Sequence, residues 1–140
     1  MVPVKLMTVL IAAIISFGIG WAWYSDMLFG KPWRKLMGVS ESSMKPGNDF
    51  MVKMLVLGLG SSILMAFVLS HAVVFANSYL GETGLVLGLM TGFWNWLGFM
   101  VPILISSYLY EKRSFKLVAI NASYWLVSLL VMGVIIAFWG

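Results

Sequence analysis

Four long apolar runs constrain this chain more than any other feature. They cover about residues 6–23, 54–75, 85–108 and 117–138, and each is continuously apolar, without the alternation of a half-buried strand. The hydrocarbon core of a bilayer is about 30 Å thick, which takes about 20 helical residues to cross. A helix satisfies all of its own backbone groups in lipid. The sequence therefore predicts an all-α, polytopic membrane protein built as a bundle of four transmembrane helices.

The composition supports the same class. Hydrophobic residues make up 61% of the chain and charged residues 10%, whereas soluble domains average about 25% charged residues. A surface this apolar needs lipid as its solvent, so the lipid bilayer is the first expected partner. A length of 140 residues predicts one transmembrane domain over 1–140.

The residue inventory argues against several kinds of chemistry. The chain has no cysteine, one histidine and five carboxylates, so neither a disulfide nor a protein metal cage is expected. We found no catalytic motif and expect neither a cofactor nor an enzyme activity. The net charge of +4 does not predict nucleic-acid binding, because eight of the nine basic residues lie in or beside two short connections.

These basic residues predict the orientation. Five belong to the connection 24–53 and three to the connection 109–116, against Lys5 alone elsewhere: Lys31, Arg34, Lys35, Lys45 and Lys53, and then Lys112, Arg113 and Lys116. Loops rich in Lys and Arg stay in the cytoplasm. We therefore expect a multi-pass protein of the cytoplasmic membrane, with both basic loops inside the cell and both termini outside.

The first basic loop has a pattern of its own. Pro32 suits the start of a helix and Gly38 its end, and Trp33, Leu36 and Met37 share one face. One interpretation is a short amphipathic helix that lies in the headgroup layer. The other is a basic flank that only sets the topology.

Small residues recur every four positions along the spans. The predicted packing positions are Gly58, Ser62, Ala66 and Ser70 in the second span, and Gly84, Gly88 and Gly92 in the third. This spacing places each set on one helix face, where missing side chains let two backbones approach. The spacing does not separate packing within the bundle from packing against another copy.

One motif resembles a known family. The run W-Y-S-x-x-x-F-G-x-x-W, preceded by Gly20, resembles the signature of the bacterial and archaeal family catalogued as domain of unknown function 1761. Its positions here are Trp23, Tyr24, Ser25, Phe29, Gly30 and Trp33, and the last span, N-A-S-Y-W-L-V-S-L-L-V-M-G-V-I-I-A-F-W, resembles that family's closing span. The resemblance implies a four-span membrane protein of unassigned activity and brings no catalytic residue with it.

Three residues within the spans are candidates for a solute or polar site. His71 is the only side chain there that titrates near neutral pH, and a hydrogen bond to Asn77, Ser78 or a neighbouring helix is its simpler use. Asn95 lies near mid-membrane, and with Pro102 it predicts either a polar site or a hydrogen bond across a helix contact.

Two functions follow as hypotheses. The first is a non-enzymatic membrane protein that acts through helix packing, either as a homo-oligomer or with a membrane-protein partner. The alternative is a small-solute transporter or channel that uses His71, Asn95 and Pro102.

Overall fold

The computed structural model describes residues 3–40 and 47–140 and is helical throughout its regular segments. The elements in chain order are α1 (Leu6–Trp23), α2 (Gly30–Met37), α3 (Asn48–Leu80), α4 (Gly84–Asn95), the π-helical turn η2 (Trp96–Met100), α5 (Val101–Leu109) and α6 (Phe115–Trp139). The segments α4, η2 and α5 form one continuous rod. This rod, α1, α3 and α6 are each long and apolar enough to cross a membrane, which confirms the predicted all-α class with four spans.

The second span is longer than its apolar run. We predicted residues 54–75, whereas α3 covers Asn48–Leu80. At 1.5 Å per residue its 33 residues extend about 50 Å, well beyond the hydrocarbon core. Its first turns carry Asp49 and Lys53, and helix geometry continues there because charged side chains are tolerated once the helix has left the hydrocarbon.

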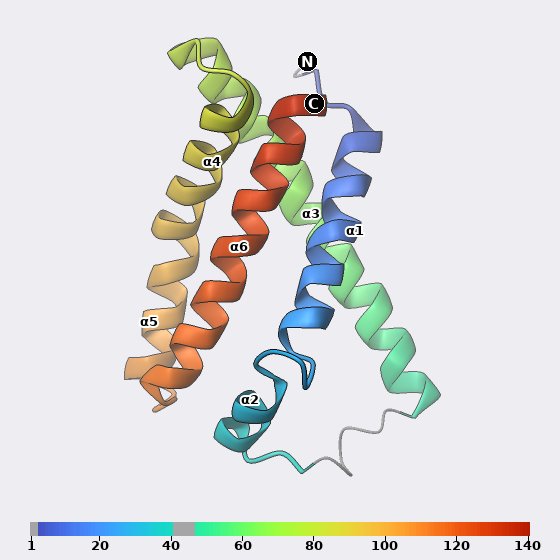
Figure 1. Ribbon diagram of the computed structural model, residues 1–140, viewed down its shortest axis with the longest axis vertical. Coiled ribbons are helices and arrows are strands. Elements are labelled where there is room, and N and C mark those ends of the chain that lie inside the picture. Colours follow the sequence, from blue (N-terminus) through green and yellow to red (C-terminus); the bar gives the residue numbers. More distant parts are fainter. Residues whose placement is uncertain (1–2, 41–46) are drawn as a thin grey trace.

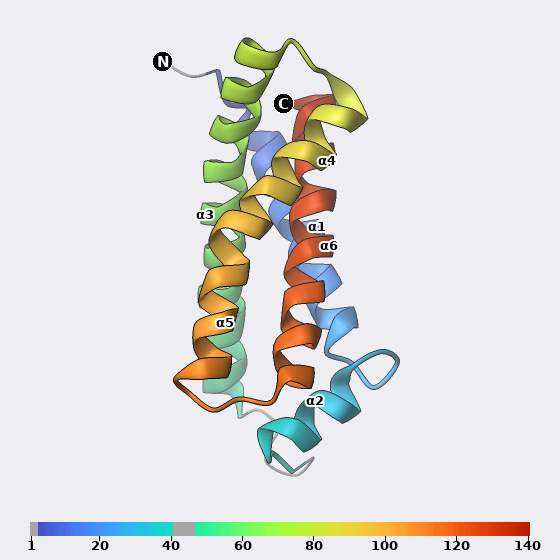
Figure 2. The ribbon, with the colours of Figure 1, turned by 90° about the vertical axis from the view of Figure 1, so that its left-hand side faces the viewer.

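The two basic connections lie at the same end of the bundle. α2 and the α5–α6 connection occupy one end, while the start of α1, the C-terminus and the α3–α4 turn occupy the other (Figures 1 and 2). The end that carries α2, Lys112 and Arg113 is called the basic end below, and the opposite one the terminal end. Arg113 reaches α2, with its Nη1 3.7 Å from Sδ of Met37.

α2 lies in the first basic loop, for which a short amphipathic helix was one of two interpretations. It ends at Gly38, whose φ of 69° lies in the left-handed region that glycine adopts at helix C-termini. Arg34 forms an ion pair with Asp26 in the turn before the helix. The location of α2 in a headgroup layer stays a prediction.

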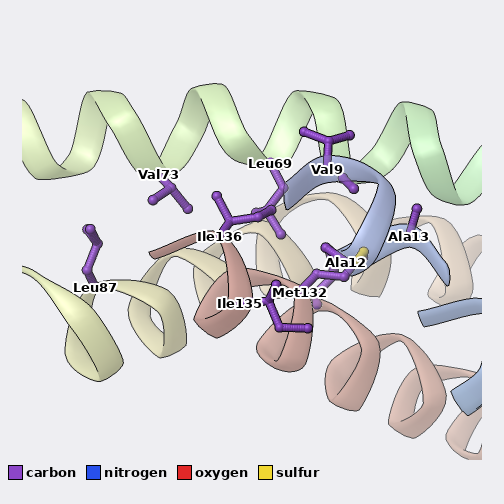
Figure 3. Close-up of a cluster of buried hydrophobic side chains, with 11 residues drawn as sticks. Val9, Ala12, Ala13, Leu69, Val73, Leu87, Met132, Ile135 and Ile136 are labelled. Carbon is purple, nitrogen blue, oxygen red and sulfur yellow. The ribbon is translucent and has the colours of Figure 1, made fainter. Parts of the chain in front are cut away.

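α6 is the central helix of the bundle, since it contacts every other helical segment. Its buried side chains meet those of α1, α3 and α4 in one apolar core, and Figure 3 shows Met132, Ile135 and Ile136 directed at this junction. Ser16 of α1 and Ser128 of α6 lie in the same interior and share a hydrogen bond of 3.1 Å. At this junction the interior is therefore filled by the chain's own side chains.

The third span packs on α6 through its glycines. A Cβ added to Gly88 would lie 2.5 Å from Cα of Val134, and one added to Gly92 would lie 2.5 Å from the carbonyl oxygen of Leu129. Gly133 of α6 meets the backbone of Gly88 in return, a position that we did not predict. Gly84 also allows the turn between α3 and α4, because its φ of +57° is one that residues with a side chain rarely adopt.

The second span packs through its regularly spaced small residues in the same way. A Cβ on Gly58 would lie 2.9 Å from Cε2 of Phe17 in α1, and Ser62, Ala66 and Ser70 are all buried. The Ser62 and Ser70 hydroxyls donate to carbonyls of their own helix. The predicted packing positions of both spans therefore lie in contacts within one chain. They are not available for contact with a second copy.

Candidate functional site

The turn between α1 and α2 folds tightly around the W-Y-S motif. The Trp23 carbonyl accepts from the Phe29 amide at 2.9 Å, and the Ser25 carbonyl accepts from the Gly30 amide at 2.9 Å. A Cβ on Gly30 would lie 2.5 Å from the carbonyl oxygen of Tyr24, so only glycine fits at this position. The Ser25 hydroxyl donates to the Ala22 carbonyl at 2.7 Å and ties the turn to the end of α1.

Two aromatic side chains of the motif attach this turn to α6. The Tyr24 hydroxyl donates to Oδ1 of Asn121 at 2.7 Å, and Nε1 of Trp23 donates to the Ile120 carbonyl at 3.2 Å. From the other side of α6, Nε1 of Trp96 donates to the Ala122 carbonyl at 2.8 Å. Three consecutive residues of α6 thus accept hydrogen bonds from α1, its following turn and η2.

Ring contacts complete the cluster. The Tyr24 ring lies edge-on to Trp33, with centroids 5.5 Å apart, and edge-on to Tyr124, with centroids 5.4 Å apart. Aromatic pairs favour this geometry. Trp23 packs on Phe29 at 4.9 Å. We call these residues the motif cluster: Gly20, Trp23, Tyr24, Ser25, Phe29, Gly30, Trp33, Asn121 and Tyr124.

Gly20 belongs to the motif cluster for a steric reason. A Cβ at this position would lie 2.8 Å from the Tyr124 hydroxyl oxygen, and Tyr124 is buried. The missing side chain lets Tyr124 fit between α1 and the Tyr24 ring. Both halves of the resemblance noted in the sequence, the W-Y-S motif and the closing span, therefore meet in one place.

A family described as protein of unknown function (DUF1761) matches residues 7–137. The chain belongs to this family. The match extends from α1 almost to the end of α6 and so takes in all four long helices. Neither a curated protein nor a solved structure was found that matches this DUF1761 chain.

The environment of Tyr24 favours its neutral form. Burial of the phenol, and secondarily the neighbouring Tyr124, raise the pKa of Tyr24 well above its ordinary value near 10. Tyr24 therefore keeps its proton and remains a donor to Asn121. The side-chain donors of Trp23, Tyr24 and Ser25 are engaged with Asn121 or with helix carbonyls, and the Tyr24 ring packs on Trp33 of α2. The motif cluster therefore connects α1, α2 and α6.

His71 has a different partner from those we considered. Its Nδ1 lies 2.9 Å from the carbonyl oxygen of Phe67 in the same helix, and the two rings pack with centroids 4.7 Å apart. Asn77 donates to the Glu82 carbonyl at 2.8 Å instead. A pocket of about 510 Å³ at the terminal end is lined by Asn77, Ser70 and Thr8, among others, but not by His71.

Asn95 lines a groove on the side of the bundle. Its Nδ2 donates to the Thr91 carbonyl of its own helix at 2.9 Å and makes no bond across a helix contact. The groove has a volume of about 440 Å³, lies between α3 and η2, and is apolar apart from Ser61 and Asn95. Within the described part of the chain, no other residue bonds to Oδ1 of Asn95.

Pro102 follows the groove residues Phe99 and Met100 closely in sequence, but it does not line the groove. It is exposed and follows the π-helical turn η2, in which the Val101 amide bonds to the Trp96 carbonyl five residues back. A proline lacks the amide proton that a regular helix would need there, and the wider turn accommodates that loss. The structure therefore does not bring His71, Asn95 and Pro102 to one site.

Sequence reasoning missed two features of the site. Neither Asn121 nor Tyr124 was predicted to contact the W-Y-S motif, although both lie in the stretch N-A-S-Y-W of the resemblance. Among residues 3–40 and 47–140, no group of three or more His, Cys, Asp or Glu could hold a metal ion.

Proposed function

We propose that this DUF1761 protein acts without catalysis, by packing against a second copy of itself along the groove between α3 and η2. The proposal rests on the free Oδ1 of Asn95 in that groove. An unpaired amide oxygen in lipid is costly, and Asn side chains hydrogen-bond readily between membrane helices. A two-fold pair of Asn95 side chains would satisfy donor and acceptor with one residue type, as a symmetric interface requires.

The shape of the groove supports a helix as its occupant. Leu64 of α3 and Phe99 of η2 both line it and are 65% and 68% exposed. Gly60 and Gly98 do not line the groove but directly precede the lining residues Ser61 and Phe99. A Cβ built on either glycine has nothing within 4 Å. The small-residue positions Gly88, Gly92 and Ala66 are already packed inside the bundle, whereas the groove offers a free polar group, Oδ1 of Asn95.

The alternative, a small-solute transporter or channel, has less support. Its three proposed residues lie apart, and Asn95 faces a groove lined mainly by Leu, Met and Phe. The junction of α1, α3 and α6 is filled by apolar side chains. Solute uptake by liposomes that carry the protein, lost in Asn95→Leu, would restore this alternative.

Crosslinking in the membrane tests the proposed dimer. The chain has no cysteine, so Phe99→Cys introduces a single thiol at the groove. It should form a disulfide-linked dimer, whereas Ile14→Cys, on the exposed outer side of α1, should not. Asn95→Leu should weaken dimerisation about 3- to 30-fold.

Ser123→Ala is the matched control for that change. Its hydroxyl is exposed and bonds only to the Ala119 carbonyl of its own helix, so its loss should leave dimerisation unchanged. A strictly monomeric particle mass in nanodiscs, with no Phe99→Cys crosslink, would refute the dimer. A crosslink from Phe99→Cys to a different membrane protein would replace the second copy by a partner helix.

We further propose that the basic end faces the cytoplasm and that both termini lie outside, in the cytoplasmic membrane. The support is the distribution of charge. The described basic residues other than Lys5 belong to the two connections at the basic end or to the first turns of α3 and α6. Retention of Lys and Arg in the cytoplasm is the general rule for short loops.

A further inference from the structure

A small polar pocket lies at the basic end, between α2, α5 and α6. Its volume is about 200 Å³, and Arg113, Glu111, Ser107 and Asn121 supply its polar lining. Leu104 and Leu117 are among its apolar residues. The pocket adjoins the motif cluster through Asn121.

Two hydrogen-bond donors in this pocket have no acceptor within the described part of the chain. Asn121 accepts from Tyr24 through Oδ1, which leaves its Nδ2 protons unused. The Ser107 hydroxyl likewise bonds to no described residue. Every buried side-chain nitrogen or oxygen of the described residues has a partner, so these two groups are reachable from the pocket that they line.

Arg113 adds a positive charge to these donors. Its Nε lies 3.8 Å from Oε2 of Glu111, and the two side chains are 43% and 61% exposed. A long ion pair between exposed groups contributes little, so the guanidinium can exchange this partner for a better one. Lys112 precedes it directly and Lys116 follows three residues later, which keeps the surroundings positive.

The depth of the pocket matches the level of lipid headgroups. α6 begins at Phe115 and its 25 residues extend about 37 Å, slightly more than the hydrocarbon core of about 30 Å. Its first turn therefore lies near the boundary between headgroups and acyl chains. Leu104, Leu117 and Val118 give the pocket an apolar part beside its polar lining.

We propose that this pocket binds the phosphate of an anionic membrane lipid. Arg113 would supply the charge-assisted hydrogen bonds, and Ser107 and Asn121 the neutral ones. Basic pockets between transmembrane helices bind such headgroups in general, and guanidinium groups suit phosphate oxygens. The lipid would displace Glu111 from Arg113. A bound headgroup would also hold α2 in place, since Arg113 contacts Met37.

Three single substitutions test this site. The probe is a short-chain phosphatidylglycerol, titrated into the purified full-length protein in an uncharged detergent. Arg113→Gln should weaken binding about tenfold or more, because it removes the charged donor. Lys112→Gln removes the same charge one residue away and outside the pocket lining, and it should change binding by less than about twofold. Glu111→Gln should strengthen binding.

Each other result overturns the proposal. Equal losses in Arg113→Gln and Lys112→Gln would mean that only the diffuse charge of the basic end matters. A loss in Glu111→Gln would mean that the carboxylate does not compete with the ligand. Equal binding of a short-chain phosphatidylcholine would remove the need for an anionic lipid. Displacement of the probe by inorganic phosphate at the same concentration would identify a site for free phosphate.

Discussion

The Tyr24 hydroxyl donates to Oδ1 of Asn121 at 2.7 Å and joins two segments that are 97 residues apart in the chain. The bond links the two parts of the chain that carry the family resemblance. It also places the α1–α2 turn against the first turns of α6, near the basic end. Stability at the basic end should therefore depend on this pair.

Removal of the Tyr24 hydroxyl should destabilise the protein measurably. We expect Tyr24→Phe to lower the free energy of unfolding by about 1 kcal/mol, in the range for hydrogen bonds between membrane helices. Titration with denaturing detergent measures this value. Tyr79→Phe is the control, because Tyr79 is 90% exposed. A double-mutant cycle with Asn121→Leu should give a coupling energy of about 0.6 kcal/mol or more, and a coupling near zero would refute the link.

The raised pKa of Tyr24 predicts a dependence on alkaline pH. Because the folded state holds the proton more tightly than the unfolded state, the stabilisation is complete below the unfolded pKa of about 10 and declines above it. The unfolded phenol ionises there while the folded one does not. Wild type should therefore lose stability relative to Tyr24→Phe by up to about 1.4 kcal/mol per pH unit above pH 10.

Comparison of these two proteins cancels the titration of the groups that they share. The difference between their unfolding free energies, measured from about pH 9 to about pH 11, isolates the contribution of Tyr24. A difference that stays constant over this range would show that the folded protein does not favour the neutral phenol.

The glycines separate into two classes that predict opposite effects of the same substitution. Gly88→Ala places a methyl group against the backbone of Val134, so α4 must move away from α6. Overpacking of this kind costs about 1 to 3 kcal/mol. Gly18→Ala, in α1 and away from the groove, meets nothing within 4 Å and should be neutral or stabilise by up to about 1 kcal/mol, since alanine is the better helix former. Equal effects of both substitutions on unfolding would contradict the observed packing.

The sequence was sufficient to predict the four spans, but it did not predict which helices pack against one another. Long apolar runs predict a crossing whatever their neighbours are, and spacing of four assigned Gly88, Gly92 and Ala66 to packed faces. Spacing does not say which helix covers a face. That depends on matching small residues elsewhere, such as Gly133 opposite Gly88, and the match appears only when two helices are placed together.

The polar residues illustrate the same limit. Asn95 and Asn121 each lie within a span, and no local pattern distinguishes them. In the fold Asn121 meets a tyrosine from another segment, while Asn95 bonds to its own helix and faces a groove. Trp and Tyr at a span end are generally belt residues of the membrane interface, yet Trp23 and Tyr24 both donate hydrogen bonds to α6. Partners so distant in sequence leave no signal in the composition around them.

The proposed orientation can be tested with single cysteines, because the natural chain has none. Glu82→Cys lies in the α3–α4 turn at the terminal end, and Lys112→Cys lies in the α5–α6 connection at the basic end; both positions are exposed. With the basic end in the cytoplasm, a membrane-impermeant maleimide added to intact cells should label Glu82→Cys and not Lys112→Cys. Permeabilised cells should show labelling of both, which controls for reactivity. Labelling of Lys112→Cys alone in intact cells would invert the orientation, and equal labelling of both would indicate insertion in two directions.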